Sequence, residues 1–177
     1  MSKIQRPFLV RVREAWQHRF PFLEPVEIDE IPRRDNGGNY RCSAFFSERS
    51  RAYFVAHQFS KVRRGEFTLE VTIADSLDRS ILEHRTASDI AAHKLGSYRI
   101  GSFIDGKDCW WALQDVEAET RRLLPSLPIA RPPGRWRPSS FDLPLDQIYD
   151  EAISDVSDKL ERYVFPKLHF PDSIHTA

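Results

Sequence analysis

One short segment, residues 66–74, constrains the fold of this chain more than any other. Its apolar side chains are Phe67, Leu69, Val71 and Ile73, and they alternate with the polar side chains of Glu66, Thr68, Glu70 and Thr72. A period of two is typical of a β-strand, whose successive side chains point to opposite faces of the sheet. The segment therefore predicts a strand with one buried and one solvent-exposed face, which antiparallel sheets allow and all-parallel sheets seldom do.

Three further strands are predicted before this segment. Two of them, Pro25 to Ile31 and Asn39 to Phe46, flank turn-forming residues that end in Gly37 and Gly38. The third, Arg51 to Ser60, leads through a second turn into the alternating strand. Short extended runs separated by turn residues indicate an antiparallel meander of four strands.

A later pair of strands is predicted around the turn Asp105-Gly106-Lys107. The flanking segments Tyr98 to Ile104 and Asp108 to Leu113 have extended character, and Gly106 can adopt the positive φ that a short hairpin requires. We therefore expect a second hairpin. The region 76–95 carries weaker signals, of which a short helix capped by Ser88 is the clearest.

Two amphipathic helices are predicted near the ends of the chain. Residues 7–20 space their apolar side chains three and four positions apart, at Phe8, Val12, Ala15 and Trp16. Residues 145–164 repeat this spacing at Leu145, Ile148, Tyr149, Ala152, Val156, Leu160 and Tyr163, and Pro166 follows. A shorter helix is expected after Gln114 or Asp115. The expected fold class is α+β: an antiparallel β-meander plus a later hairpin, packed on one face by the N- and C-terminal helices.

The chain is expected to form a single domain over residues 1–177, because one core usually organises about 100 to 200 residues. Within this domain, residues 130–144 hold Pro132, Pro133, Pro138 and Pro144 and are expected to form a surface loop without regular structure. Residues 168–177 are expected to be a loosely held tail.

The charge is balanced in total and uneven along the chain. Residues 1–64 hold 13 Lys and Arg against 7 Asp and Glu, whereas residues 65–177 hold 13 against 19. The two parts therefore carry opposed charge unless the fold interleaves them. A pI near 7.0 argues against strong non-specific nucleic-acid binding, which needs several uncompensated cations.

The same composition bounds the location and the chemistry. No apolar run approaches the roughly 18 residues that span a bilayer, so we expect a cytoplasmic protein without a membrane partner. Cys42 and Cys109 are expected to be reduced. The histidines form no HxxxH or HExxH pair, and the phosphate-loop, dinucleotide and hydrolase motifs are missing, so we expect no metal, no cofactor and no catalytic residue.

His57 is the single candidate for a general base. It lies in an apolar row of the third predicted strand. It is therefore either a base in a dry pocket or, as we favour, a histidine at the edge of the core whose ring binds a backbone carbonyl.

The second hairpin holds one group of candidate binding residues. Trp110 and Trp111 are adjacent, so in a strand one ring faces the core and the other faces outward, where it borders a groove and anchors a partner unless a helix covers it. Arg99 and Asp108 are placed to pair across the hairpin. Their pair either fixes the register or joins a tryptophan in a polar and aromatic cluster.

The proline-rich segment holds a second group. Arg131, Arg135 and Arg137 surround Trp136. Cations around an aromatic ring are typical of sites for phosphates or unstacked bases. The other interpretation is a tryptophan over the core with arginine side chains around it.

Several short motifs, in this order, resemble a bacterial family of small cytosolic proteins that is classed as a domain of unknown function. The motifs are Q-x-S, G-x-F-T, R-I-G and D-x-W-W, within FVAHQFS, GEFTLEVTI and SYRIGSFIDGKDCWWAL. The matching residues are Gln58, Ser60, Phe67, Thr68, Arg99, Ile100, Gly101, Asp108, Trp110 and Trp111. The resemblance spans roughly residues 5 to 125 and implies an α+β fold in a single bacterial domain, with no site residues to carry over.

These observations favour a non-catalytic protein-binding module with another protein as its partner. A solvent-exposed sheet face, opposed charges and unpaired aromatic residues are expected, while local catalytic signatures are missing. The alternative is a binder of single-stranded nucleic acid or a phosphate ligand through Arg131 to Arg137. An enzyme of unrecognised type with His57 as its base is the third hypothesis.

Overall fold

The computed structural model describes residues 4–31, 40–48, 51–60, 65–75, 94–115, 117, 118, 122 and 135–168. The helices are α1 (Gln5–Arg19), α4 (Gly101–Ile104) and α6 (Leu145–Lys159), and α6 continues into a π-helical turn, η1 (Leu160–Val164), and a 3-10 turn, η2 (Phe165–Leu168). The strands are β1 (Glu24–Ile31), β2 (Tyr40–Glu48), β3 (Arg51–Phe59), β4 (Glu66–Asp75), β5 (Lys94–Arg99), β6 (Trp110–Ala112) and β7 (Arg135–Trp136).

The α+β class and the four-strand meander are confirmed. Each of the strands β1 to β4 pairs antiparallel with the next, and the sheet order is β1-β2-β3-β4-β6-β7, with β5 also paired to β4. The two predicted helices form, with α1 ending at Arg19 ahead of Pro21. The second helix continues past Pro166 as η2, because proline is tolerated in the first turn of a helical segment.

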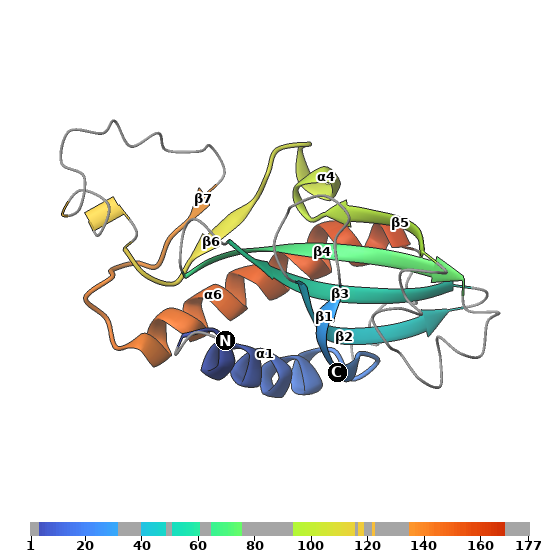
Figure 1. Ribbon diagram of the computed structural model, residues 1–177, viewed down its shortest axis with the longest axis horizontal. Helices are drawn as coiled ribbons and strands as arrows, with labels where there is room; N and C mark the ends of the chain where they lie inside the picture. The colour runs from blue at the N-terminus through green and yellow to red at the C-terminus, as the bar shows by residue number, and fades with distance from the viewer. Residues whose placement is uncertain are drawn as a thin grey trace.

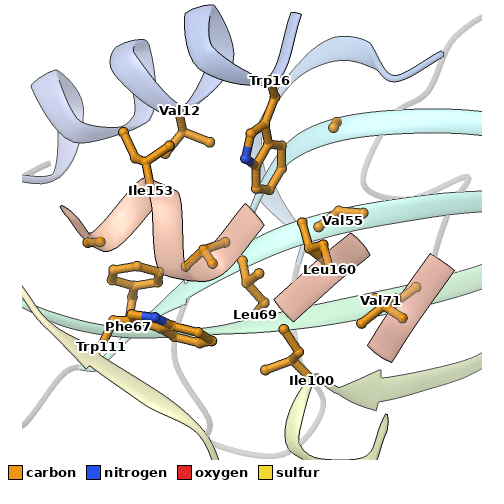
Figure 2. Packing of buried hydrophobic residues seen from close by; sticks show 14 of the residues in the cluster. Val12, Trp16, Val55, Phe67, Leu69, Val71, Ile100, Trp111, Ile153 and Leu160 are labelled. Carbon is orange, nitrogen blue, oxygen red and sulfur yellow. The ribbon is translucent and has the colours of Figure 1, made fainter. Parts of the chain in front are cut away.

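The helices α1 and α6 lie on the same face of the sheet (Figure 1). Figure 2 shows Val12 and Trp16 of α1 and Ile153 of α6 over Val55 and Leu69 of the sheet. The basic helix α1 meets the acidic side of α6, and the ion pairs include Arg11–Asp146 at 2.7 Å and Arg19–Asp158 at 2.6 Å. The fold therefore interleaves the opposed charges of the two parts of the chain.

The prediction of a later hairpin is wrong, because β5 and β6 both pair antiparallel with β4 and not with each other. Arg99 lies opposite Glu70, and Trp111 lies opposite Phe67. The Ile100 N–H donates to the Leu69 carbonyl at 3.0 Å and continues the ladder between the two pairings. The strands β5 and β6 are thus two parts of one interrupted edge strand.

Residues 101–108, here called the edge loop, leave the sheet after β5 and return before β6. A Cβ atom on Gly101 would lie 1.7 Å from the Lys107 carbonyl oxygen, so only glycine allows the two ends of the loop to approach so closely. Gly106 has the predicted positive φ, 78°, but it turns the edge loop and not a hairpin.

The prediction that one face of β4 is exposed to solvent is also wrong. The polar side chains of this strand are buried, like its apolar ones. Glu66 pairs with Arg135. The Thr68 hydroxyl donates to the Cys109 carbonyl at 2.7 Å, and the hydroxyls of Thr72 and Ser97 share a hydrogen bond at 2.8 Å. Polar groups that find such partners inside the protein can be buried at little cost.

The segment 130–144 contains a regular element that we did not predict. The two residues of β7 pair parallel with β6, with Arg135 opposite Trp110 and Trp136 opposite Trp111. Prolines stand at positions 133 and 138, and between them the backbone keeps the N–H groups that a ladder needs.

Other predictions are only partly within the described residues. Asp115 caps the third predicted helix, since its Oδ1 accepts the N–H groups of Glu117 and Ala118 at 3.1 and 3.0 Å. The predicted tail was wrong at its first residue, because Leu168 ends η2 and is buried. The rest of the tail, the predicted helix at Ser88 and Arg131 lie outside the described residues. In the part of the chain that is described, no helix has both the length and the apolar character that crossing a bilayer requires.

Val71→Asp should unfold the protein. Val71 is fully buried between the sheet and the helices, and an unpaired carboxylate there should cost about 5 kcal/mol, close to the whole stability of many domains. The same change at the exposed Val10 of α1 is the control and should leave the melting temperature within a few degrees. A melting temperature that Val71→Asp leaves unchanged would contradict the sheet assignment.

Candidate functional site

The outer edge of β5 has no partner among the described strands, as is also true of the outer edges of β1 and β7 at the two ends of the sheet order. Among the described strands, β4 is the partner of β5, and β7 occupies the corresponding outer position beside β6. Because the Ile100 N–H points to β4 and antiparallel ladders alternate, the N–H of Tyr98 also points to β4, while those of Ser97 and Arg99 point away from it. The Arg99 carbonyl accepts the Ser102 hydroxyl at 2.7 Å. The open backbone groups therefore centre on Ser97.

This edge strand also carries exposed apolar side chains. Leu95 is 62% exposed and Tyr98 is 47% exposed. Edge strands with such side chains are usually avoided in soluble proteins because they pair with other chains. Lys94, at the start of β5, is the kind of residue that limits such pairing. The Tyr98 ring makes an edge contact with Phe103 of α4, with 6.1 Å between ring centres.

Arg99, Asp108 and Trp110 come together on the opposite face of β5 from Tyr98, which is one of the two arrangements considered for this ion pair. Arg99 Nη1 lies 2.7 Å from Asp108 Oδ2, and the guanidinium carbon lies 5.7 Å from the centre of the Trp110 ring. The ion pair joins the two ends of the edge loop, so the loop brings these residues together where we expected a hairpin to do so.

The two tryptophans alternate between faces, as predicted. Trp110 is half-buried, whereas Trp111 is fully buried and stacks on Phe67 at 5.4 Å. The Trp111 Nε1–H donates to Asp155 Oδ2 at 2.7 Å. Trp111 is therefore a core residue, and the groove beside Trp110 stays a prediction.

The basic residues of the proline-rich segment face carboxylates of the protein itself. The Arg135 side chain is 6% exposed and pairs with Glu66 and with Glu117, the latter at 3.3 Å. Arg137 also pairs with Glu117, and the half-buried Trp136 packs against the core. This geometry matches the second interpretation, a tryptophan over the core with arginine side chains around it.

His57 lies inside the core and away from solvent. Its ring centre is 5.7 Å from that of Phe8, 5.4 Å from that of Trp16 and 5.3 Å from that of Phe67. Burial lowers the pKa of His57 to about 3, so the imidazole is neutral near pH 7. Burial also raises the pKa of Cys109 to about 11, which keeps this thiol protonated and unreactive.

A surface groove of about 540 Å³ separates parts of α1 and α6. Its charged lining includes Arg11, Arg19 and Asp150, and Arg11 lies 3.5 Å from Asp150 across it. The Ser157 hydroxyl at its base accepts the Trp16 Nε1–H at 3.0 Å. Among the described residues, no three His, Cys, Asp or Glu side chains gather as a metal ion would require.

Comparison with known proteins adds no relative: no family model, no curated protein and no solved structure matches the chain. The resemblance to a bacterial family of unknown function therefore stays a prediction. The structure shows an α+β fold in which β5 is an edge strand that has β4 as its partner among the described strands.

Neither the exposed Leu95 nor the position of β5 at the edge of the sheet was predicted from the sequence. Tyr98 was predicted to lie in a hairpin, where pairing would have been with Asp108 to Leu113. Lys94 beside the apolar Leu95 was an available signal, because lysine is common on edge strands.

Trp111→Ala should destabilise the protein far more than Trp110→Ala. Removal of a buried tryptophan typically costs about 3–5 kcal/mol, whereas Trp110 is half-buried and its replacement should cost clearly less. Urea unfolding of both variants measures the difference. Equal losses would mean that the two rings are equivalent core residues.

His57 should make the free energy of unfolding depend on pH. The folded-state pKa of His57 is lowered to about 3, so between that value and about 6.5 the unfolded chain binds a proton that the folded protein does not. Stability from the neutral ring is present above pH 6.5 and is lost as the pH falls, by about 2 kcal/mol between pH 7 and pH 5. His57→Leu should reduce this dependence by that amount. Replacement of the exposed His18 by Gln is the control, and an unchanged dependence in His57→Leu would contradict the assignment.

Proposed function

We propose that the protein is a non-catalytic protein-binding module and that it binds an extended segment of another protein along the outer edge of β5. One observation carries the proposal: on this edge strand, outward-pointing N–H groups at Ser97 and Arg99 occur together with exposed side chains at Leu95 and Tyr98. An added strand satisfies such backbone groups by main-chain hydrogen bonds, and its side chains provide specificity.

The position of β7 supports strand addition at this side of the sheet. The strands β5 and β6 lie end to end along β4, and β7 forms the next row beside β6 (Figure 1). A segment bound to β5 continues the row that β7 begins. The length of β5, Lys94–Arg99, sets the bound segment at about six residues, since paired strands match residue for residue.

Amide exchange in the isolated protein tests whether the edge is open. The N–H groups of Ser97 and Arg99 should exchange at least about tenfold faster than those of Tyr98 and Ile100, which point to β4. Residue-resolved NMR at low protein concentration measures these rates. Slow exchange at Ser97 in a monomeric sample would mean that the edge is already covered, and would overturn the proposal.

A proline at position 97 should abolish binding without unfolding the protein. Ser97→Pro removes an outward N–H and leaves the ladder to β4 intact, as edge strands tolerate. Ser97→Ala is the matched control, because it also loses the hydroxyl contact with Thr72 but keeps the N–H. Peptides of about eight residues, selected on the native protein from a random display library, should bind Ser97→Ala normally and Ser97→Pro at least about tenfold more weakly. Selection of no peptide, or of peptides that Ser97→Pro binds equally well, would contradict strand addition.

The molar mass in solution identifies the occupant. A monomer whose Ser97 amide is protected only after peptide is added fits a partner segment. A dimer that Ser97→Pro dissociates would show that a second copy of the chain occupies the edge, and would replace the proposed partner.

A further inference from the structure

We infer that Tyr98, held over Gly96, forms an apolar subsite that selects the side chains of the bound strand, so that the partner segment is an amphipathic strand. This inference rests on the proposed function, because it concerns the same edge of β5. It adds which side chains the partner must carry and which residues of this chain recognise them.

Gly96 and Tyr98 lie on the face of β5 that is turned to the helices. Tyr98 pairs with Val71, which belongs to the core on that side, and Gly96 pairs with Ile73, which packs against this core. A Cβ atom on Gly96 would lie 3.0 Å from Cε2 and from the hydroxyl of Tyr98, so the ring lies along the strand above the glycine. Phe103 contacts the ring at an angle of 74° and supports it from the edge loop.

This arrangement leaves much of the Tyr98 ring exposed to solvent, where it contributes little to the stability of the fold. Tyr98 is 47% exposed, whereas Val71 directly opposite is fully buried. Glycine inside a strand weakens it, and it is expected where another group approaches the backbone closely. Here the group that approaches is the Tyr98 ring, and the result is a flat apolar surface beside an open backbone edge.

An added strand meets different chemistry on its two faces. A residue that bonds to Ser97 points to the face of Arg99 and its ion pair with Asp108, which is polar. Its two neighbours along the strand point to the helix side, opposite Gly96 and Tyr98, where side chains of paired residues lie about 5 Å apart. The bound segment is therefore apolar, polar and apolar at three successive positions, centred on the residue that bonds to Ser97.

The test uses peptides selected on the native protein whose binding Ser97→Pro abolishes. Their affinity should fall at least about tenfold with Tyr98→Ala, which removes the ring. Gly96→Ala should also weaken binding, because the added methyl group would lie 3.0 Å from the ring and must shift it. Tyr98→Phe keeps the ring and should bind within about twofold of the native protein, as should Ser97→Ala on the opposite face. The selected peptides should lose affinity when either outer position of the apolar, polar, apolar triplet becomes Ser, and should tolerate Ser at the central one.

The outcomes separate this inference from the proposed function. If Ser97→Pro abolishes binding but Tyr98→Ala leaves it unchanged, strand addition stands and the subsite is overturned. If Ser97→Pro has no effect, the proposed function itself fails. Thermal melting of each variant confirms folding, and Gly96→Ala retains every side chain of the site if Tyr98→Ala proves unstable.

Discussion

The pairing of β4 with an interrupted strand determines most of this structure. Phe67 stacks on Trp111 of β6, Leu69 receives the Ile100 N–H, and Val71 lies opposite Tyr98 of β5. Because both parts of the partner strand must meet the same edge of β4, the chain between them leaves and returns within one narrow gap, which Gly101 makes possible. The interruption also divides the outer edge in two, one part covered by β7 and the other, beside β5, without a partner among the described strands.

The predictions that held depend on local patterns. The apolar stripe of residues 145–164 specifies a helix wherever it packs, and the alternation of residues 66–74 specifies a strand, because both are properties of the backbone period. The predictions that failed depend on distant partners. Gly106 turns the chain as expected, but whether the flanking segments pair with each other or with β4 is decided by residues far away in sequence. Periodicity likewise assigns Glu66 to one face of a strand without saying whether that face is covered.

In the candidate site, too, local features could be predicted from the sequence and contacts with distant residues could not. The convergence of Arg99, Asp108 and Trp110 was predictable, because a hairpin and the edge loop both bring the ends of one short segment together. The fate of Arg135 was not, since its partners Glu66 and Glu117 come from other parts of the chain and convert an apparent basic patch into an internal ion network. The open edge at Ser97 depends on strand order, which no local motif encodes.

The contact between the first and last described helices has a consequence for how the chain is made. Trp16 bonds to Ser157 across 141 positions, and the Tyr149 hydroxyl donates to the Ile4 carbonyl across 145. Contacts of such long range slow folding, because the intervening chain must be ordered before they form. During synthesis α6 emerges after α1 and the meander, so the part of the apolar sheet face that α6 covers stays exposed until α6 has been made. The nascent chain therefore exposes apolar surface, which favours aggregation, throughout the interval between the synthesis of β4 and that of α6.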